Sequence, residues 1–130
     1  MWRRVDGLRA MELGTPGEQR ARLTAHVLTG RKRATTGLLA EYEGEGEPLE
    51  QVGERLPLVD DDGAPLAVVR VTAVTVCPFA EVTWEFADAE GECFIDLRDW
   101  REVHRAFWKG QGTEVEDSTQ VVCVRFDLEA

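Results

Sequence analysis

The stretch that decides the fold is Gln120–Leu128, which reads QVVCVRFDL. Successive side chains of a β-strand point to opposite faces, so every second residue shares a face. The residues that share one side of this stretch are Val122, Val124, Phe126 and Leu128. The alternation predicts a closing strand packed on a core.

A β-hairpin is predicted upstream, where apolar runs at 56–59 and 66–76 flank Asp60-Asp61-Asp62-Gly63. The Asp-Gly pair supplies the positive φ angles that a tight turn requires. Three adjacent aspartates could also suggest a metal site. The turn explains them and is the favoured interpretation.

Helices are expected on both sides of this hairpin. Thr15 can cap a helix that has Pro16 at its first position, Glu18 in a capping box and an end near Thr29. Gly30 is placed to end it in the left-handed conformation, and residues 30–36 are expected in the loop that follows. A short helix at 38–42 gives way to an exposed acidic loop that contains glycines and a proline.

Two further helices are expected after the hairpin, at 80–89 and from Asp96 onward, with a break at Gly91. Asp96 can cap the second of them. That helix carries an apolar stripe at spacings of three and four, which favours core packing for its tryptophans and for His104. The order of elements is not the βαβ alternation of a doubly wound sheet. We therefore expect an α+β fold, a small barrel flanked by helices.

Length and composition indicate one domain over residues 1–130, because 43% hydrophobic residues can fill a single core. No apolar run approaches the roughly 18 residues of a membrane span, and no signal peptide is recognisable. We expect a soluble, cytoplasmic protein without a membrane partner. Three dispersed cysteines and two distant histidines predict reduced, mostly buried thiols and no intrinsic metal site.

The net charge of -10 has the wrong sign for a protein that grips duplex nucleic acid along its whole surface. The basic residues are unevenly spread, however. Between positions 20 and 33 there are five basic residues and no acidic one, which leaves 10 basic against 25 acidic residues elsewhere. The five are Arg20, Arg22, Arg31, Lys32 and Arg33. A local positive site for a short or single-stranded anion is compatible with this pattern.

Short motifs follow one another over nearly the whole chain in an order that resembles the bacterial ASCH family. They are Met11–Gly17, Gly30–Lys32, Gly37–Tyr42, Val74–Val82, Glu90–Glu92, Trp100-Arg101, His104, Phe107-Trp108 and Val121–Cys123. Each motif is weak, and their joint order carries the likeness. The resemblance implies a barrel related to the PUA RNA-binding domain, with a cleft lined by the Gly-x-Lys loop.

The resemblance implies RNA or a nucleoside as partner and leaves three activities open. The favoured one is a ribonuclease that acts on single-stranded RNA through a cleft around Lys32, with Mn or Mg as a candidate divalent cation. The alternatives are an amidohydrolase that deacylates N4-acetylcytidine-type nucleosides and a non-catalytic RNA-binding regulatory module. A shared fold does not choose among them.

Carried over by resemblance, the catalytic residues of the amidohydrolases correspond to Lys32, Thr35 and Glu92, with Glu90 as the fallback for the glutamate. The chain departs from many relatives at Gly37, where they place an arginine. In this scheme Thr35 attacks the acyl carbon and Glu92 protonates the leaving amine.

From the residues themselves, the flanking charges of Arg31 and Arg33 favour a neutral Lys32 that could act as a general base. For nucleic-acid binding we expect contacts from Arg31, Arg33 and Arg20. Tyr42 is the candidate for base stacking.

Overall fold

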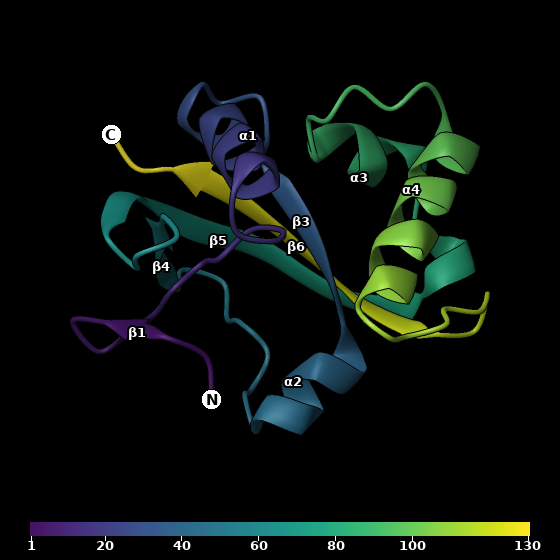
Figure 1. Ribbon diagram of the computed structural model, residues 1–130, viewed down its shortest axis with the longest axis horizontal. Coiled ribbons are helices and arrows are strands. Elements are labelled where there is room, and N and C mark those ends of the chain that lie inside the picture. The colour runs from purple at the N-terminus through teal and green to yellow at the C-terminus, as the bar shows by residue number, and fades with distance from the viewer.

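The computed structural model describes residues 1–130. Its elements are β1 (Arg4–Val5), β2 (Leu8–Arg9), α1 (Glu18–Leu28), β3 (Ala34–Leu38), α2 (Leu39–Glu45), β4 (Arg55–Val59), β5 (Pro65–Pro78), the 3-10 turn η1 (Phe79–Glu81), α3 (Trp84–Ala89), α4 (Leu97–Gly110) and β6 (Gln120–Leu128). Figure 1 shows their course from the N-terminus to the C-terminus.

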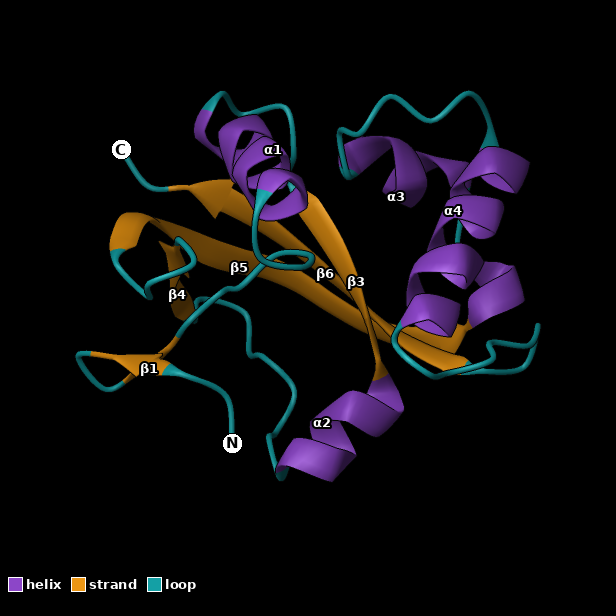
Figure 2. Ribbon diagram, in the orientation of Figure 1, coloured by secondary structure: helices purple, strands orange, loops and turns teal.

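The main sheet has four strands in the order β3-β6-β5-β4, and every neighbouring pair is antiparallel. It curls into a half-barrel with helices beside it (Figure 2). Strands β1 and β2 form a separate small hairpin. A parallel bridge between Met11 and Leu58 joins the chain after that hairpin to the edge strand β4. The expected α+β class with a PUA-like, helix-flanked sheet is confirmed.

The last strand has the bounds that the sequence predicts, but it does not close the sheet at an edge. Strand β6 lies between β3 and β5. Because both of its faces are covered, Val121 and Val122 are both fully buried although they point to opposite sides. Leu128, expected on the core side, lies beyond this cover and is 37% exposed.

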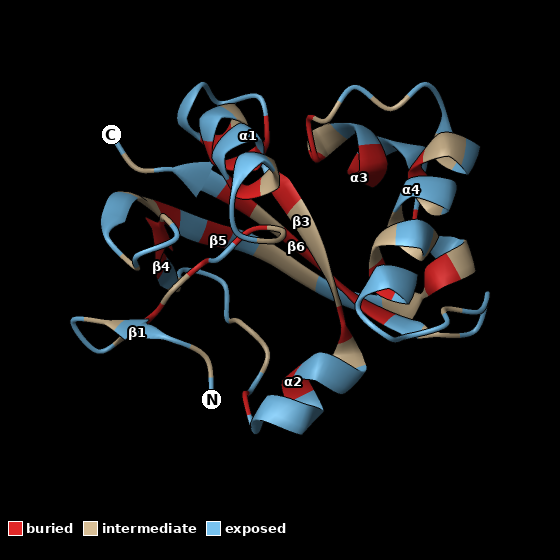
Figure 3. Ribbon diagram, viewed as in Figure 1, coloured by how far each residue is buried: buried red, intermediate tan, exposed pale blue.

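Two hydrophobic clusters lie on the two faces of β6. Val122 and Val124 pack with Leu23 and Val27 of α1. Val121, on the other face, belongs to a cluster that contains residues of α3 and α4. Helix α1 and the α3–α4 pair therefore cover opposite faces of the sheet, and buried residues follow the contacts between these helices and strands (Figure 3).

The hairpin turn is confirmed. Asp60 accepts hydrogen bonds from the backbone N–H groups of Asp62 and Ala64, both at 2.9 Å, and Gly63 has a φ of 80°. Asp61 instead accepts from the N–H of Gly17 at 3.0 Å. The carboxylates of Asp60 and Asp61 are thus engaged in turn and loop contacts.

The start of α1 differs from the expected capping box. The helix begins at Glu18 after Gly17, which has a φ of 102° and no side chain with which to cap. The N–H of Thr15 donates to Oε1 of Gln19 at 2.7 Å, so the predicted capping residue is held by a helix side chain. The predicted end is confirmed, because Gly30 has a φ of 78°.

Two other boundaries also differ, and one agrees. Helix α2 continues through Gly44 to Glu45 and ends at Gly46 with a φ of 64°. The helix expected at 80–89 is divided into η1 and α3, because Val82 is extended and Thr83 caps α3 by accepting from the N–H of Phe86. The helix α4 starts as predicted, with Asp96 accepting from the N–H of Asp99 at 2.8 Å.

The cysteines are free, as expected, but differ in burial: Cys123 is buried, Cys77 is half-buried and Cys93 is exposed. Burial together with the neighbouring Cys77 thiol raises the pKa of Cys123 to about 12. None of the helices combines the length and the apolar character required to cross a bilayer.

Candidate functional site

The loop after α1 carries Lys32 to the inside of the molecule. Gly30 turns the chain, and the N–H of Lys32 then donates to the carbonyl of His26 at 2.9 Å. The N–H of Arg33 donates to the carbonyl of Ala89 at the end of α3, at 2.8 Å. These bonds join the loop to the 89–92 segment and leave Lys32 only 2% exposed.

Lys32 lies between two carboxylates. Its Nζ is 3.4 Å from Oε1 of Glu90 and 3.2 Å from Oε2 of Glu92. Glu90 has a side chain that is 2% exposed, whereas that of Glu92 is 19% exposed. The side chain of Lys32 is therefore an ion-paired ammonium, with one fully buried partner and one partner that reaches solvent.

Glu90 is the centre of a buried polar network. Its Oε2 accepts hydrogen bonds from Oγ1 of Thr36 at 3.0 Å and from Nε1 of Trp100, and lies 3.4 Å from Nε2 of His104. Burial by itself raises the pKa of a carboxyl group, but the charge of Lys32 and the bonds from His104 and Trp100 outweigh it and lower the pKa of Glu90 to about 2. Glu90 is therefore held as a fixed carboxylate.

These side chains surround a small cavity of about 80 Å³. The polar residues of its wall are Gln19, Lys32, Thr35, Thr36, Glu90, Glu92 and His104. Thr35 and Thr36 also line a larger pocket of about 400 Å³, as do Phe107 and Trp108. The two spaces thus share a wall, and the small polar cavity adjoins the larger pocket at the threonines.

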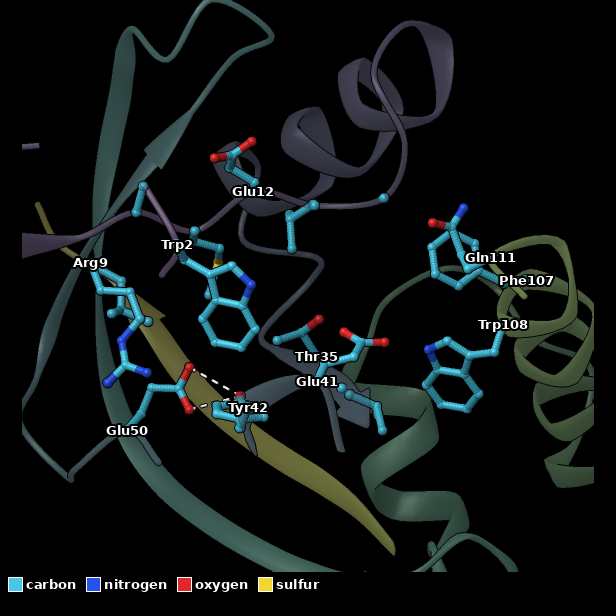
Figure 4. Close-up of a pocket in the computed structure, with 17 residues that line it drawn as sticks. Trp2, Arg9, Glu12, Thr35, Glu41, Tyr42, Glu50, Phe107, Trp108 and Gln111 are labelled. Carbon is cyan, nitrogen blue, oxygen red and sulfur yellow. Dashed lines mark hydrogen bonds between the residues drawn. The ribbon is translucent and has the colours of Figure 1, made fainter. Parts of the chain in front are cut away.

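The larger pocket has aromatic sides and acidic edges. Figure 4 shows Trp2 and Tyr42 on one side and Phe107 and Trp108 on the other, with Thr35 and Glu41 between them. The hydroxyl of Tyr42 donates to Glu50, whose carboxylate oxygens are 2.8 and 3.1 Å away. A volume near 400 Å³ is at the small end of the range of about 300–1,000 Å³ for ligand pockets.

The structure brings together four sequence-predicted residues, Lys32, Thr35, Glu90 and Glu92, around the small cavity. Thr35 reaches it from a strand and not from the expected loop, because Ala34–Leu38 pairs with β6. Both candidate glutamates contact Lys32.

Tyr42 lines the larger pocket, but it is only 6% exposed and its ring packs edge-on against Trp2.

The three arginines expected to bind nucleic acid do not line the small cavity. Arg20 is 7% exposed and donates to the carbonyls of Leu13 and Gly14, so its guanidinium fastens the chain before α1. Arg31 and Arg33 are exposed, and Arg31 lies 3.6 Å from the Cys93 sulfur.

The expected closeness of the flanking arginines to the Lys32 amine is not found among its contacts. The side chains of Arg31 and Arg33 stay at the surface, while two carboxylates lie within 3.4 Å of Nζ. The charged groups nearest to Nζ are therefore carboxylates and not the guanidinium groups of the neighbouring residues. The same ion pairs argue against the expected divalent cation. The Lys32 ammonium already occupies the position between the Glu90 and Glu92 carboxylates, so these two ligands do not fit Mn or Mg.

Sequence reasoning missed three members of the site, namely Thr36, Trp100 and His104. The last two were expected in the core. Trp100 is fully buried and the side chain of His104 is 11% exposed, but both contact Glu90. Trp100 and His104 are four residues apart, so they share one face of α4 and their rings stack at 4.2 Å. This i,i+4 spacing of two hydrogen-bonding rings was the available signal.

The chain is similar to known proteins at the level of a family. The family model of the ASCH domain matches residues 9–129. No curated protein matches the chain significantly.

Solved structures support the same assignment. A crystal structure of an Enterococcus faecalis protein is 32% identical, with a TM-score of 0.81, over 91% of this chain and 74% of that one. The ASCH domain of Lactobacillus crispatus is 28% identical, with a TM-score of 0.79, over 92% of this chain and 77% of that one.

A mutant ASCH protein of Zymomonas mobilis shares the fold at 9% identity, with a TM-score of 0.55, over 82% of this chain and 63% of that one. The family match spans most of the chain, and the solved ASCH domain shares its half-barrel fold. The chain belongs to the ASCH domain family.

Proposed function

We propose that the protein is a small amidohydrolase that removes an acyl group from the exocyclic amine of a nucleoside, as in N4-acetylcytidine. The observation that carries the proposal is the ion-paired Lys32 with Glu90 and Glu92 in one cavity with Thr35. A hydroxyl, an ammonium and a carboxylate are the groups that acyl transfer needs as nucleophile, oxyanion stabiliser and proton carrier.

The charge of the cavity favours an uncharged reacting group. Lys32 carries one positive charge and Glu90 and Glu92 carry two negative ones, so the ion-paired set is net negative. A phosphodiester brought to this point would meet carboxylates beside its single cation. The amide of an acylated nucleoside carries no charge and avoids this repulsion.

Thr35, Glu92 and Lys32 can each be given a role in the first half of the reaction. The Thr35 oxygen attacks the acyl carbon, and its proton passes to the Glu92 carboxylate. Lys32 donates a hydrogen bond to the oxyanion that forms. Its contacts to Glu90 and Glu92 are long, at 3.2–3.5 Å, so the ammonium can turn a proton toward the oxyanion.

The C–N bond then breaks as Glu92 returns the proton to the leaving amine. Water attacks the acyl-threonine with Glu92 again as the base, which releases the acid and restores the hydroxyl. Glu90 has no part in proton transfer. It holds Lys32 in position.

The test is to incubate the protein with N4-acetylcytidine and follow cytidine by chromatography. We expect the wild type to release cytidine and Lys32→Ala, Thr35→Ala and Glu92→Gln to lower kcat by about 100-fold or more, as loss of a nucleophile, an oxyanion donor or a proton carrier does. The matched control is Glu102→Gln on the exposed side of α4, which should retain full activity.

RNA cleavage is the second candidate, and the exposed pair Arg31 and Arg33 beside Lys32 favours it. The same preparations are therefore incubated with single-stranded RNA, with and without Mn or Mg. Cleavage that disappears in Lys32→Ala, together with no cytidine release, would replace our proposal by a ribonuclease. Binding of RNA without turnover of either substrate would indicate a non-catalytic module.

A further inference from the structure

We infer that Trp2 forms the stacking wall of a slot that accepts a flat, uncharged heteroaromatic ring. The slot is the larger pocket beside the small cavity, and the inference rests on the proposed function because it names how the substrate's base is held. Trp2 lies in residues 1–8, the N-terminal strap, which precede the part of the chain matched by the family model.

The strap is fastened by one buried carboxylate. The side chain of Glu47 is 2% exposed, and its Oε2 accepts from the backbone N–H of Trp2 at 2.7 Å. Both terminal nitrogens of Arg4 donate to the same carboxylate, at 2.9 and 2.8 Å. Charge-assisted, bidentate bonds of this kind fix geometry as well as adding stability. Glu47 therefore holds the backbone at Trp2 directly and, two residues later, through Arg4.

The indole of Trp2 offers its surface to the pocket. Its ring packs against Tyr42 in a T-shaped contact, with centroids 4.8 Å apart and planes at 79°. Trp2 is only half-buried, whereas Tyr42 is 6% and Trp108 2% exposed. Of these three rings, Trp2 thus has the most surface left for a ligand, while Trp108 bounds the opposite side (Figure 4).

The charged residues of the pocket wall indicate which charge a bound ring can carry. Its wall contains the carboxylates of Glu12, Glu41 and Glu50 and the single guanidinium of Arg9. Glu12 is paired with Arg3 at 3.1 Å and Arg20 at 3.5 Å, so Glu41 and Glu50 are the carboxylates without a salt bridge. Arg9 already donates to the carbonyl of Pro48 and to Glu54. Two carboxylates without a salt bridge disfavour a phosphorylated ligand and can accept hydrogen bonds from an uncharged ring with N–H donors at its edge.

The geometry places ring binding and amide hydrolysis side by side. Thr35 and Thr36 belong to the walls of both spaces. A ring stacked on Trp2 would lie in the larger pocket, and an exocyclic acyl group directed past the threonines would enter the cavity of Lys32. Trp2 is thus a specificity-determining residue, while the chemistry takes place at the other end.

Binding of cytidine, the product of the proposed reaction, tests this without turnover. Isothermal titration of the wild type should give a Kd that Trp2→Ala raises about tenfold, as expected for loss of one base–aromatic stack, and that Trp2→Phe largely restores. Arg4→Ala loosens the fastening of the strap and should raise Kd in the same direction. Trp84→Ala removes a tryptophan on α3 that lines neither space and should change nothing.

Two further measurements separate this inference from the proposed function. Cytidine 5′-monophosphate should bind more weakly than cytidine, and with N4-acetylcytidine Trp2→Ala should raise KM while kcat stays nearly constant. Equal Kd values for the wild type and a folded Trp2→Ala, or no binding of cytidine at all, would overturn the role of Trp2. Cytidine binding that depends on Trp2 without hydrolysis would overturn the amidohydrolase and leave the slot standing.

Discussion

At the scale of single residues, Glu90 is the group on which both stability and the site depend. Its pKa is lowered to about 2, so its charged form stabilises the folded state. The contribution is fully present above the unfolded value near 4.3 and is lost as pH falls through the folded value. A shift of this size corresponds to about 3 kcal/mol.

We predict that Glu90→Gln lowers the free energy of unfolding by about 3 kcal/mol at pH 7, since it leaves Lys32 with one partner in a buried site. The difference from the wild type should shrink between about pH 5 and pH 2. Urea unfolding at a series of pH values measures it. Glu92→Gln, which alters the half-exposed partner, should cost clearly less, and a pH-independent difference would contradict the linkage.

The sequence allowed the residues of the small cavity to be named but not their contacts. Lys32, Thr35 and the two glutamates follow from motif order, and they do line one cavity. The surroundings of Lys32 were misjudged because Arg31 and Arg33, its neighbours along the chain, are exposed, while the carboxylates beside Nζ come from the segment after α3. Such contacts are non-local and leave no trace in the spacing of residues.

At the scale of elements, the turn at Gly91 sets the spacing between the Lys32 loop and both glutamates. Gly91 has a φ of 69°, and a Cβ built there would lie 2.2 Å from the carbonyl oxygen of Arg31. A side chain at this position would force the two backbone segments apart. The site therefore requires glycine for two reasons, backbone conformation and close approach.

We predict that Gly91→Ala destabilises the protein by at least about 2 kcal/mol and abolishes hydrolysis, because Glu90 and Glu92 move away from Lys32. Thermal unfolding and the cytidine-release assay measure the two effects. Gly30→Ala is the matched control: it has a φ of 78°, but its Cβ would meet nothing within 4 Å. It should show the strain alone, about 1 kcal/mol, and equal losses in both variants would refute the close-approach argument.

Elements with local signals were predicted well. The Asp96 cap, the Asp-Gly turn and the strand Gln120–Leu128 each have a signal within a few residues, and each is confirmed. Strand β3 was taken for a loop, because Thr35, Thr36 and Gly37 carry no apolar alternation. Its extended form depends on pairing with β6, which comes from the other end of the chain.

At the scale of the whole molecule, the fold is organised by its last strand. Strand β6 is hydrogen-bonded to β3 on one side and to β5 on the other. It also supplies buried residues to the clusters on both faces of the sheet. The sequence shows that β6 is a strand, but its central position follows from how distant strands pair, which periodicity does not encode.

This central position leads to a prediction about deletions. Removing residues 120–130 leaves β3 and β5 without their shared partner and uncovers both clusters, a loss larger than the total stability of about 5–15 kcal/mol of a typical domain. We expect a chain without a cooperative unfolding transition or near-ultraviolet dichroism.

Removing the N-terminal strap, residues 1–8, is the comparison, because β1 and β2 form a separate sheet and the four-stranded sheet stays intact. That chain should unfold cooperatively and show the same rise in the Kd for cytidine as Trp2→Ala. Circular dichroism during thermal unfolding, followed by titration, measures both. A cooperative transition in the chain that lacks β6 would show that the sheet can form without its central strand. If the chain that lacks the strap is unfolded, the strap is part of the core and not only a wall of the pocket.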